Sequence, residues 1–579
     1  MERKNGRNRF LDRRGQIPIY QYAIAIAVLV VIIIGMIFVI RRYTPTKEHM
    51  SLEDFYVLTV ENEAAVIVNG EYKEVTTEDE AIHAVAIDGN VYLEIGFLKD
   101  VLDDGYVYDA TEGILRYVTD KDVVSASLNS DAYTVGKTRE SLGKDVVIAQ
   151  NGNYFVALDF ITMYTDLSYS VAEAPNRVMI ETAGYTKKVA TLKKDAALRR
   201  FGGVKSKILK DAQKGDELIV LEDYGKWSHV LTEDGVLACV QNRRLSKITE
   251  QTVEATLPER TYNHLTVNGD IILGWHQVAS AAGNSKVSEA VASTGITVVS
   301  PTWFYLDDNQ GGIASLASSD YVSYCHENNI QVWGLVSNLE NKNVDTTTVL
   351  NTTSARDNLV NNLITQAITY NLDGINVDME ALSVAAKDGY IEFIRELSIK
   401  CEKNDIILSV DNYVPTDSTA FYNRSVQADY ADYVIIMAYD EHYAGDDEAG
   451  SVASIGFVEE GVKNTLAEVP AEQIILGMPF YARVWKSSAD GLSSSAYGMD
   501  ELEAFLERNG AVKTWSEKDG QYYAEFSDGT ATYMAWVEDV TSLGKKLDVM
   551  KANHLAGAAF WKLGFETDAV WDTVSNYFK

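Results

Sequence analysis

The chain has 579 residues, several times the roughly 100–200 residues of one ordinary domain, so two to four domains are expected. Its 46% apolar and 23% charged residues exclude a mainly disordered or fibrous protein. The net charge is −33, although residues 1–47 hold nine basic and only two acidic residues, and an acidic body of this kind argues against a nucleic-acid partner. The three cysteines are too few and too separated for a disulfide framework or a CxxC zinc site, and we expect neither a metal nor a cofactor.

An uncharged apolar segment near the N-terminus is long enough to cross a membrane. It runs over residues 23–40 (AIAIAVLVVIIIGMIFVI), and about 20 apolar residues span a bilayer core as a helix. Six basic residues precede it, namely Arg3, Lys4, Arg7, Arg9, Arg13 and Arg14. This bias predicts a cytoplasmic basic tail (residues 1–22) and a single-pass cell-membrane protein whose remainder is extracellular. A cleaved signal peptide is the alternative, but no small-residue cleavage site follows Ile40.

Two accessory domains are predicted before residue 250. Within residues 51–185, the run DGNVYL at 88–93 recurs 63 residues later as NGNYFV at 151–156, each followed by a short helix and a hairpin. This repeat resembles the small α+β domain named after the N-terminal region of copper amine oxidases. No histidine cluster accompanies it, so we assign it spacing or binding. Residues 187–248 resemble a bacterial SH3-type barrel, which is either a binding module for cell-wall peptides or glycans or a spacer with Trp227 in its core.

From about residue 255 onward, short β-rich runs alternate with helical stretches. Eight such runs can be counted, at residues 270–275, 296–304, 330–338, 372–380, 406–414, 433–440, 474–485 and 557–566. Eight strand–helix units in this length predict an α/β fold, a (β/α)8 TIM barrel over residues 255–579. The pieces 512–515, 522–526 and 532–536 predict a small insertion at about 486–553. In such barrels the active site lies at the C-terminal ends of the strands.

The fourth run carries charges where a buried strand should have none. With a period of two, Asn376, Asp378 and Glu380 point into the barrel, while Ile375, Val377 and Met379 face the helices. Burying a carboxylate costs several kcal/mol unless it is paired, so a functional role is favoured over a solvated strand end or a structural hydrogen-bond ladder. We expect anionic Asp378 to raise the pKa of Glu380, so that Glu380 keeps a proton near neutral pH.

Here the sequence resembles a known enzyme family. The run DGINVDME at 373–380 is similar to the DGxDxDxE signature of family 18 glycoside hydrolases, MAYD at 437–440 to its sixth-strand motif, and GMPFYARVW at 477–485 to its seventh. The resemblance covers residues 260–579 and implies a retaining, substrate-assisted mechanism. It implies that Glu380, Asp378 and Tyr439 are catalytic. The substrate-binding residues that it implies are Asp373, Asn376, Met437, Asp440, Tyr481, Arg483 and Trp561.

Two departures from that signature affect the expected chemistry. Asn376 replaces the family's middle aspartate, and Met379 stands where the family usually has Trp or Phe. Because Asn376 cannot ionise, we expect Asp378 to stay charged over a wider pH range than in the family. The DGxNxDxE form is similar to the branch of spore-cortex and peptidoglycan N-acetylglucosaminidases. The expected partner is therefore a polysaccharide containing N-acetylglucosamine, with peptidoglycan preferred. The alternatives are a chitinase-type hydrolase, a non-catalytic glycan-binding surface protein, and an envelope scaffold in which the repeat does the binding.

Overall fold

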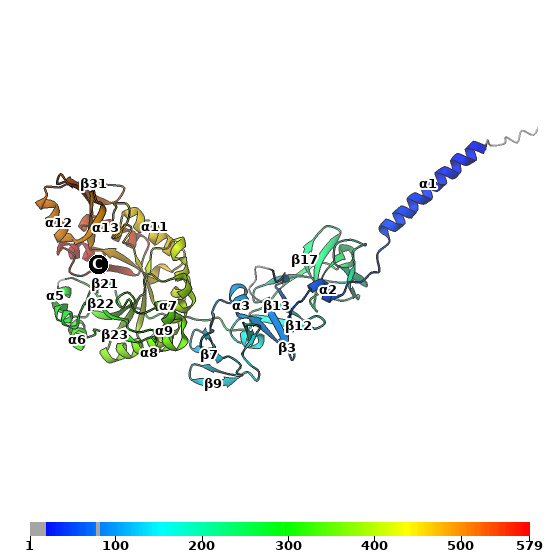
Figure 1. Ribbon diagram of the computed structural model, residues 1–579, viewed down its shortest axis with the longest axis horizontal. Helices are drawn as coiled ribbons and strands as arrows, with labels where there is room; N and C mark the ends of the chain where they lie inside the picture. The colour runs from blue at the N-terminus through cyan, green and yellow to red at the C-terminus, as the bar shows by residue number, and fades with distance from the viewer. Residues whose placement is uncertain (1–18, 77–81, 293, 579) are drawn as a thin grey trace, which may run out of the picture. The chain divides into compact units, whose positions relative to one another are not determined.

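The computed structural model describes residues 19–76, 82–292 and 294–578 and divides into two units (Figure 1). The first holds residues 1–97 and 150–258, and the second holds residues 98–149 and 259–579. Helix α1 (Ile19–Tyr43) is 25 residues long and contains the predicted segment 23–40, with Arg41 and Arg42 in its last turn. By length and composition it could cross a membrane, a test that a signal sequence also passes. The six basic residues predicted to precede it lie outside the described residues.

The predicted repeat is present as two strand–helix pairs. Strand β4 (Asn90–Glu94) leads into α3 (Ile95–Val101), and β11 (Asn153–Ala157) leads into α4 (Leu158–Ile161). The two strands pair antiparallel, with Phe155 opposite Glu94 and Ala157 opposite Tyr92. Strand β3 pairs with the other edge of β4 in the same sheet, and four more strands of this region form a second sheet in the order β12-β13-β1-β2. Their bounds are Ala65–Val68 (β1), Glu71–Lys73 (β2), Ala84–Ile87 (β3), Leu167–Ala172 (β12) and Arg177–Thr182 (β13).

Residues 186–252 fold as one antiparallel sheet in the order β16-β15-β19-β18-β17-β14-β20. The strands are Thr186–Thr191 (β14), Ala196–Arg199 (β15), Ile208–Ala212 (β16), Glu217–Asp223 (β17), Trp227–Thr232 (β18), Leu237–Gln241 (β19) and Thr249–Thr252 (β20). Leu198, Val230 and Ala238 are fully buried at the centre of its core. Trp227 is only half-buried at the start of β18. The strand-rich prediction is confirmed, whereas the SH3 resemblance stays a prediction.

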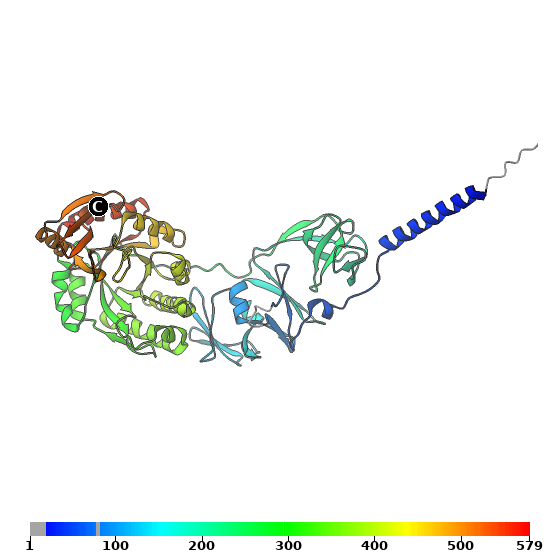
Figure 2. The same ribbon diagram turned by 45° about the horizontal axis from the view of Figure 1, so that its top comes forward.

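The eight predicted strand runs form a closed parallel barrel (Figures 1 and 2). The order is β21-β34-β28-β27-β26-β25-β24-β22, and pairing of β21 with β22 closes the ring. The strands are Ile271–His276 (β21), Val298–Leu306 (β22), Gln331–Ser337 (β24), Gly374–Asp378 (β25), Ile407–Tyr413 (β26), Tyr433–Met437 (β27), Ile474–Pro479 (β28) and Gly557–Trp561 (β34). The predicted TIM barrel is thereby confirmed.

Helices surround this barrel and bury its outer face. The main ones are Val287–Val291 (α5), Ser319–Glu327 (α6), Thr346–Asn351 (α7), Thr353–Tyr370 (α8), Lys387–Glu402 (α9), Arg424–Tyr430 (α10), Ile455–Thr465 (α11), Val540–Ala552 (α13) and Ala569–Tyr577 (α14). Two apolar layers result. Trp275, Leu335 and Ile435 fill the interior, while Ile375 and Val377 pack outward against the helices.

The insertion begins earlier than predicted. Barrel strand β28 ends at Pro479, and the next strand already belongs to the antiparallel sheet β30-β29-β33-β32-β31. These strands are Tyr481–Ser488 (β29), Gly491–Gly498 (β30), Val512–Ser516 (β31), Gln521–Ser527 (β32) and Ala531–Val537 (β33), with helix Met499–Arg508 (α12). It also ends earlier, because Leu543 and Leu547 of α13 pack into the barrel's own core.

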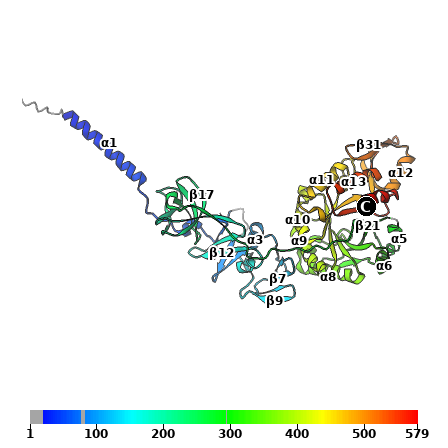
Figure 3. The same cartoon turned by 180° about the vertical axis from the view of Figure 1, so that it is seen from behind.

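Part of the predicted repeat domain belongs with the barrel. Residues 98–149 carry the sheet β5-β6-β7-β8-β9, whose strands are Tyr106–Asp109, Ile114–Val118, Val123–Ser127, Ala132–Val135 and Thr138–Ser141. Arg116 Nη2 lies 2.7 Å from Asp357 Oδ2 on α8. Asp109 Oδ2 accepts a hydrogen bond from Thr353 N at 2.8 Å, and Tyr430 on α10 donates to Val118 O at 3.1 Å. These contacts attach the sheet to α8–α10 (Figure 3), so the predicted 51–185 domain is divided.

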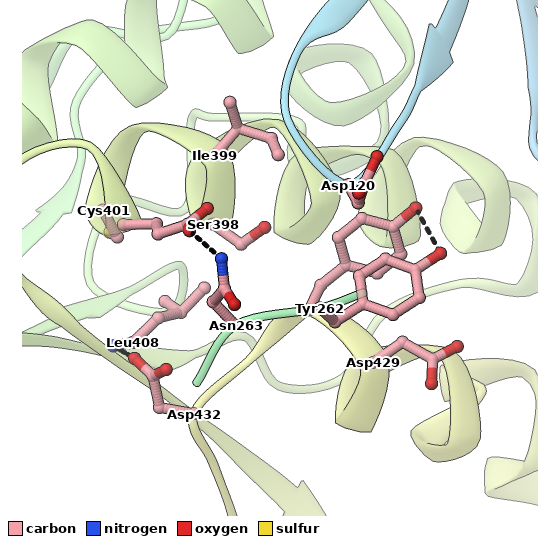
Figure 4. A pocket seen from close by; sticks show the side chains of 11 residues that line it. Asp120, Tyr262, Asn263, Ser398, Ile399, Cys401, Leu408, Asp429 and Asp432 are labelled. Atoms are coloured by element: carbon pink, nitrogen blue, oxygen red, sulfur yellow. Dashed lines mark hydrogen bonds between the residues drawn. The ribbon is translucent and has the colours of Figure 1, made fainter. Parts of the chain in front are cut away.

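The N-terminal end of the barrel is closed by the segment that enters it. Asn263 Nδ2 donates to Glu402 Oε1 at 2.8 Å, and the hydroxyl of Tyr262 lies 3.4 Å from that of Tyr430 (Figure 4). Further on, Leu265 N donates to Asp432 Oδ1 at 2.6 Å. The pocket drawn in Figure 4 is therefore a seam at the end of the barrel opposite the C-terminal strand ends.

Candidate active site

Strand β25 places its side chains as the period of two predicts. Ile375, Val377 and Met379 belong to the helix-facing core, whereas Asn376 is fully buried inside the barrel. Glu380 follows the strand at its C-terminal tip. Its backbone is held by Asn338, whose Oδ1 accepts from Glu380 N and whose Nδ2 donates to Glu380 O, both at 2.9 Å. The strand and these two hydrogen bonds together fix the position of the Glu380 backbone, from which its side chain extends.

The carboxyl group of Glu380 has one hydroxyl partner. Tyr413, at the end of neighbouring strand β26, donates to Glu380 Oε2 at 2.9 Å. Burial raises the pKa of Glu380, and the charges of Asp440 and Glu340 raise it further, against the opposing effect of the Tyr413 hydrogen bond. The predicted direction is therefore confirmed, but the predicted cause is not, because burial is the main cause and Asp440 and Glu340, rather than Asp378, are the charges that add to it. A carboxyl that keeps its proton to higher pH is suited to protonating a leaving group.

Below Glu380, Asn376 is held by three buried partners. Its Oδ1 accepts from Trp275 Nε1 at 3.0 Å and from Ser300 Oγ at 2.9 Å. Its Nδ2 donates to Asp411 Oδ1 at 2.8 Å. An indole N–H can only donate, so Trp275 fixes the orientation of the Asn376 amide. Asn376 consequently joins strands β21, β22 and β26 at the base of the site.

Asp411 is the residue that the sequence analysis missed. It is 2% exposed, and it interrupts the apolar run 406–414 as Asp378 interrupts the run before it. The same rule applied to the fifth run would have found it. Burial raises the pKa of Asp378 well above its usual value, and Asp411 is the largest charge that adds to the effect. The expectation that Asp378 stays ionised over a wider pH range is therefore wrong, because the carboxyl that Asn376 lacks is supplied by β26.

Aromatic side chains line the site between β21, β27 and β34. The ring of Trp275 lies 5.9 Å from that of Trp561 and 6.5 Å from that of Tyr439, both edge-on. Tyr439 is also 6.4 Å from Tyr481, whose hydroxyl donates to Asp440 Oδ1 at 2.5 Å. Burial, followed by the charge of Asp411, raises the pKa of Tyr439 well above its usual value. Tyr439 therefore keeps its hydroxyl proton and remains a donor.

The remaining predicted residues divide into those near the site and one that is not. Met437 has the inward parity of Ile435 at the end of β27 and is 9% exposed. Arg483 lies on β29, where its Nε donates to Ser494 Oγ at 2.9 Å. Asp373 precedes β25 and accepts from Val332 N and His326 Nε2, both at 2.8 Å. It therefore sits at the N-terminal end of a strand about 17 Å long, and the structure does not bring it to the site as predicted.

The comparisons with known proteins agree with this geometry. Residues 302–566 match the family model described as "Glycosyl hydrolases family 18". The chain is 26% identical over 281 residues to "Uncharacterized glycosylase YvbX" of Bacillus subtilis, covering 46% of this chain and 80% of that protein. It is 23% identical over 268 residues to the "Cortical fragment-lytic enzyme" of the same organism, covering 44% and 62%.

Similar relationships extend to chitinases and to solved structures. Chitinase A1 of Niallia circulans is 25% identical over 262 residues, which are 37% of each chain. The structure of the Bacillus cereus spore cortex-lytic enzyme SleL aligns with a TM-score of 0.49 at 18% identity, covering 56% of this chain and 79% of that one. A barrel with this strand order, a glutamate at the tip of its fourth strand and this family match lead to one conclusion. The second unit of the chain carries a glycosidase domain of glycoside hydrolase family 18, related to chitinases and spore cortex-lytic enzymes.

Proposed function

We propose that the protein is a membrane-anchored retaining glycosidase that hydrolyses β-1,4 linkages next to N-acetylglucosamine in peptidoglycan. The observation that carries this proposal is the position of Glu380. Its carboxyl group lies at the C-terminal end of β25, accepts a hydrogen bond from Tyr413 and has a raised pKa, while Asn338 holds its backbone. A family 18 barrel with an intact acid at this position is expected to be active.

The proposed reaction uses the substrate's own acetamido group. Glu380 protonates the glycosidic oxygen of the leaving sugar while the acetamido oxygen attacks the anomeric carbon, which forms an oxazolinium ion. Asp378 accepts the acetamido N–H and balances the positive charge. Tyr439 donates to the acetamido oxygen and holds it near the anomeric carbon. Glu380 then takes a proton from water, which opens the ring with retention of configuration.

The site offers matching surfaces for such a sugar. Trp561 and Trp275 supply an apolar wall beside the two carboxyl groups, and Trp561 would lie beneath the distorted sugar ring. Tyr481 and Asp440 form a linked polar pair on the side of β27 and β29 and could bind sugar hydroxyls. Asn376, Met437 and Arg483 would complete the binding surface. Trp561 and Met437 stand at the C-terminal ends of barrel strands, where substrates are expected, and Tyr481 and Arg483 come from the first strand of the insertion.

Peptidoglycan is preferred to chitin for two reasons. One relative is named a cortical fragment-lytic enzyme, and cortical fragments are the target that its name states. In addition, α1 is apolar enough to anchor the chain, which favours a substrate close to the cell surface. With a cytoplasmic basic tail, the catalytic domain would face the outside of the membrane.

The proposal is tested by incubating the full-length protein, and its Glu380→Gln variant, with purified peptidoglycan and with chitin oligosaccharides. Mass spectrometry of the products should reveal new N-acetylglucosamine reducing ends from peptidoglycan. The variant should be slower by about 10²- to 10⁴-fold, because glutamine cannot donate a proton. Equal products from both proteins would exclude Glu380 as the acid. Products from chitin alone would make the protein a chitinase-type hydrolase, and binding without cleavage would make it a glycan-binding protein.

A further inference from the structure

A second buried carboxyl group, that of Asp411, lies near Asp378. It stands on strand β26, whereas the family signature has its second carboxyl group at position 376 on β25. In the parallel pair β25–β26, Asn376 is opposite Ser409 and Val377 is opposite Val410. The next residues on the two strands are Asp378 and Asp411. Neighbouring strands lie about 4.8 Å apart. Two inward-facing aspartates that stand opposite each other on such strands are therefore neighbours in the sheet.

Three observations place the Asp411 carboxyl inside the barrel. Its Oδ1 accepts from Asn376 Nδ2 at 2.8 Å, and Asn376 in turn binds Trp275 in the inner core. Residues of the same parity on β26 behave alike, since Tyr413 reaches Glu380. The alternate residue Asn412 instead faces α10, where it bonds Gln427 Oε1 at 2.7 Å.

The two aspartates differ in what stabilises their charges. The Oδ1 atom of Asp378 is buried and has no hydrogen-bond partner among the described residues, whereas Asp411 receives the Asn376 amide. A hydrogen-bond donor favours the ionised form of a carboxyl. Among the residues that the structure describes, no Lys, Arg or His forms an ion pair with Asp378 or Asp411. The titratable groups that face the pair are Glu340, Glu380, Tyr390, Tyr422 and Tyr439.

We propose that Asp411 is a positioning residue that shares one proton with Asp378, in place of the carboxyl that Asn376 cannot provide. In the resting enzyme the proton is on Asp378, and Asp411 is the anion that accepts the Asn376 amide. When an acetamido N–H approaches Asp378, the proton moves from Asp378 to Asp411. The pair keeps its single negative charge, which is now on Asp378. This inference rests on the proposed function and specifies how its second carboxylate is made ready.

The test moves the carboxyl between the two strands. Full-length wild type, Asp411→Asn and the double variant Asn376→Asp/Asp411→Asn are compared on a chromogenic N,N′-diacetylchitobioside from pH 3 to 9. In Asp411→Asn, Asp378 must ionise without Asp411 to take its proton, so the acidic limb of kcat/KM should move to higher pH by about one unit or more. The double variant, which returns the carboxyl to β25, should bring the limb back toward the wild-type position. An unmoved limb in Asp411→Asn, or a double variant no different from it, would overturn the proposal.

A control and a second readout separate this proposal from a structural role. Asp432→Asn changes a buried aspartate at the other end of the barrel, where Leu408 N donates to it at 2.8 Å, and should leave the acidic limb in place. The melting temperature of Asp411→Asn should exceed that of the wild type at pH 8 and approach it at pH 5, since the variant has one fewer buried carboxyl group that must retain a proton. A melting temperature lowered equally at both pH values would contradict the shared proton. This readout decides the question even if the wild type cleaves neither the probe nor peptidoglycan, an outcome that would refute only the proposed function.

Discussion

Two groups of buried carboxylates in the second unit have opposite surroundings. At the mouth of the barrel, Asp378, Asp411 and Glu380 lie together, and no cation of residues 19–76, 82–292 or 294–578 forms an ion pair with them. Between α8 and α9, Glu396 lies 3.2 Å from Arg356 Nε, and both side chains are at most 4% exposed. An ion pair of this kind holds helices together, whereas carboxyl groups crowded together without cations cost stability and retain protons. The two groups therefore differ in whether an arginine neutralises the carboxylate. One does so between α8 and α9, which favours a structural role there, and none does so at the barrel mouth, where the carboxyl groups retain protons.

Glu392 shares properties with both groups of carboxylates. It is fully buried on α9, with Arg395 Nη1 3.7 Å away, yet neither of its carboxylate oxygens has a hydrogen-bond partner in the described structure. Burial and the neighbouring Glu396 raise its pKa to about 7, despite the lowering effect of Arg395 and Arg356. By position it belongs with the ion pair of α8 and α9, but its raised pKa resembles that of the carboxyl groups at the barrel mouth.

The largest effect is expected from removing the cation of the ion pair between α8 and α9. Arg356→Met should lower the free energy of unfolding by about 3–5 kcal/mol, because Glu396 is left buried without its partner. Urea denaturation at pH 7 measures this loss. The double variant Arg356→Met/Glu396→Leu should recover most of it. A single variant as stable as the wild type would show that the pair does not hold α8 to α9.

At the barrel mouth, removing a charged group should stabilise the fold instead of destabilising it. Asp378→Asn should reduce kcat by about 10²-fold, since the positive charge of the oxazolinium ion loses its counter-charge. It should also raise the melting temperature at pH 8, because one of several crowded carboxylates no longer ionises. Steady-state kinetics and thermal melting check the two parts separately. A variant that is both active and less stable would place Asp378 with the structural carboxylates.

Glu392→Gln should stabilise the protein in a pH-dependent way. The pKa of Glu392 is raised from 4.5 to about 7 on folding, so its contribution to stability is full below about pH 4.5 and is lost as the pH rises through 7. The variant should therefore be more stable than the wild type by about 2–3 kcal/mol at pH 8, with a much smaller difference at pH 5. Denaturation at the two pH values measures the change, and equal differences at both would contradict it.

The smallest effect is expected at Tyr413. Its hydrogen bond to Glu380 Oε2 lowers the pKa of that carboxyl, so Tyr413→Phe should move the basic limb of kcat/KM to higher pH by about half a unit to one unit. Activity at neutral pH should fall by less than about tenfold. Tyr422→Phe is the matched control, because Tyr422 donates to Met379 O and not to Glu380. A limb that moves equally in both variants would exclude a specific effect of Tyr413.

Features set by local pattern were predictable from the sequence. The eight barrel strands and the inward direction of Asn376 and Asp378 follow from apolar runs and a period of two. Features set by distant partners were not. Asp411 gains its role only when β26 lies beside β25, and Asn338 clamps Glu380 across 42 positions in the chain. The position of Asp373 was misjudged because its motif is continuous in sequence while its two ends lie at opposite ends of the barrel.

The sheet β5–β9 also affects which fragments of the protein would stay together after proteolysis. The chain passes between the two units after residues 97, 149 and 258, so the barrel is joined to the N-terminal helix by more than the final connector. Glu254, Ala255 and Thr256 in that connector are exposed. A single cut there would produce two fragments on a denaturing gel, yet the severed barrel would stay bound to residues 98–149 through Arg116, Asp109 and Tyr430. Separation of the barrel from residues 1–97 and 150–258 would thus require cleavage on both sides of this sheet as well as in the connector.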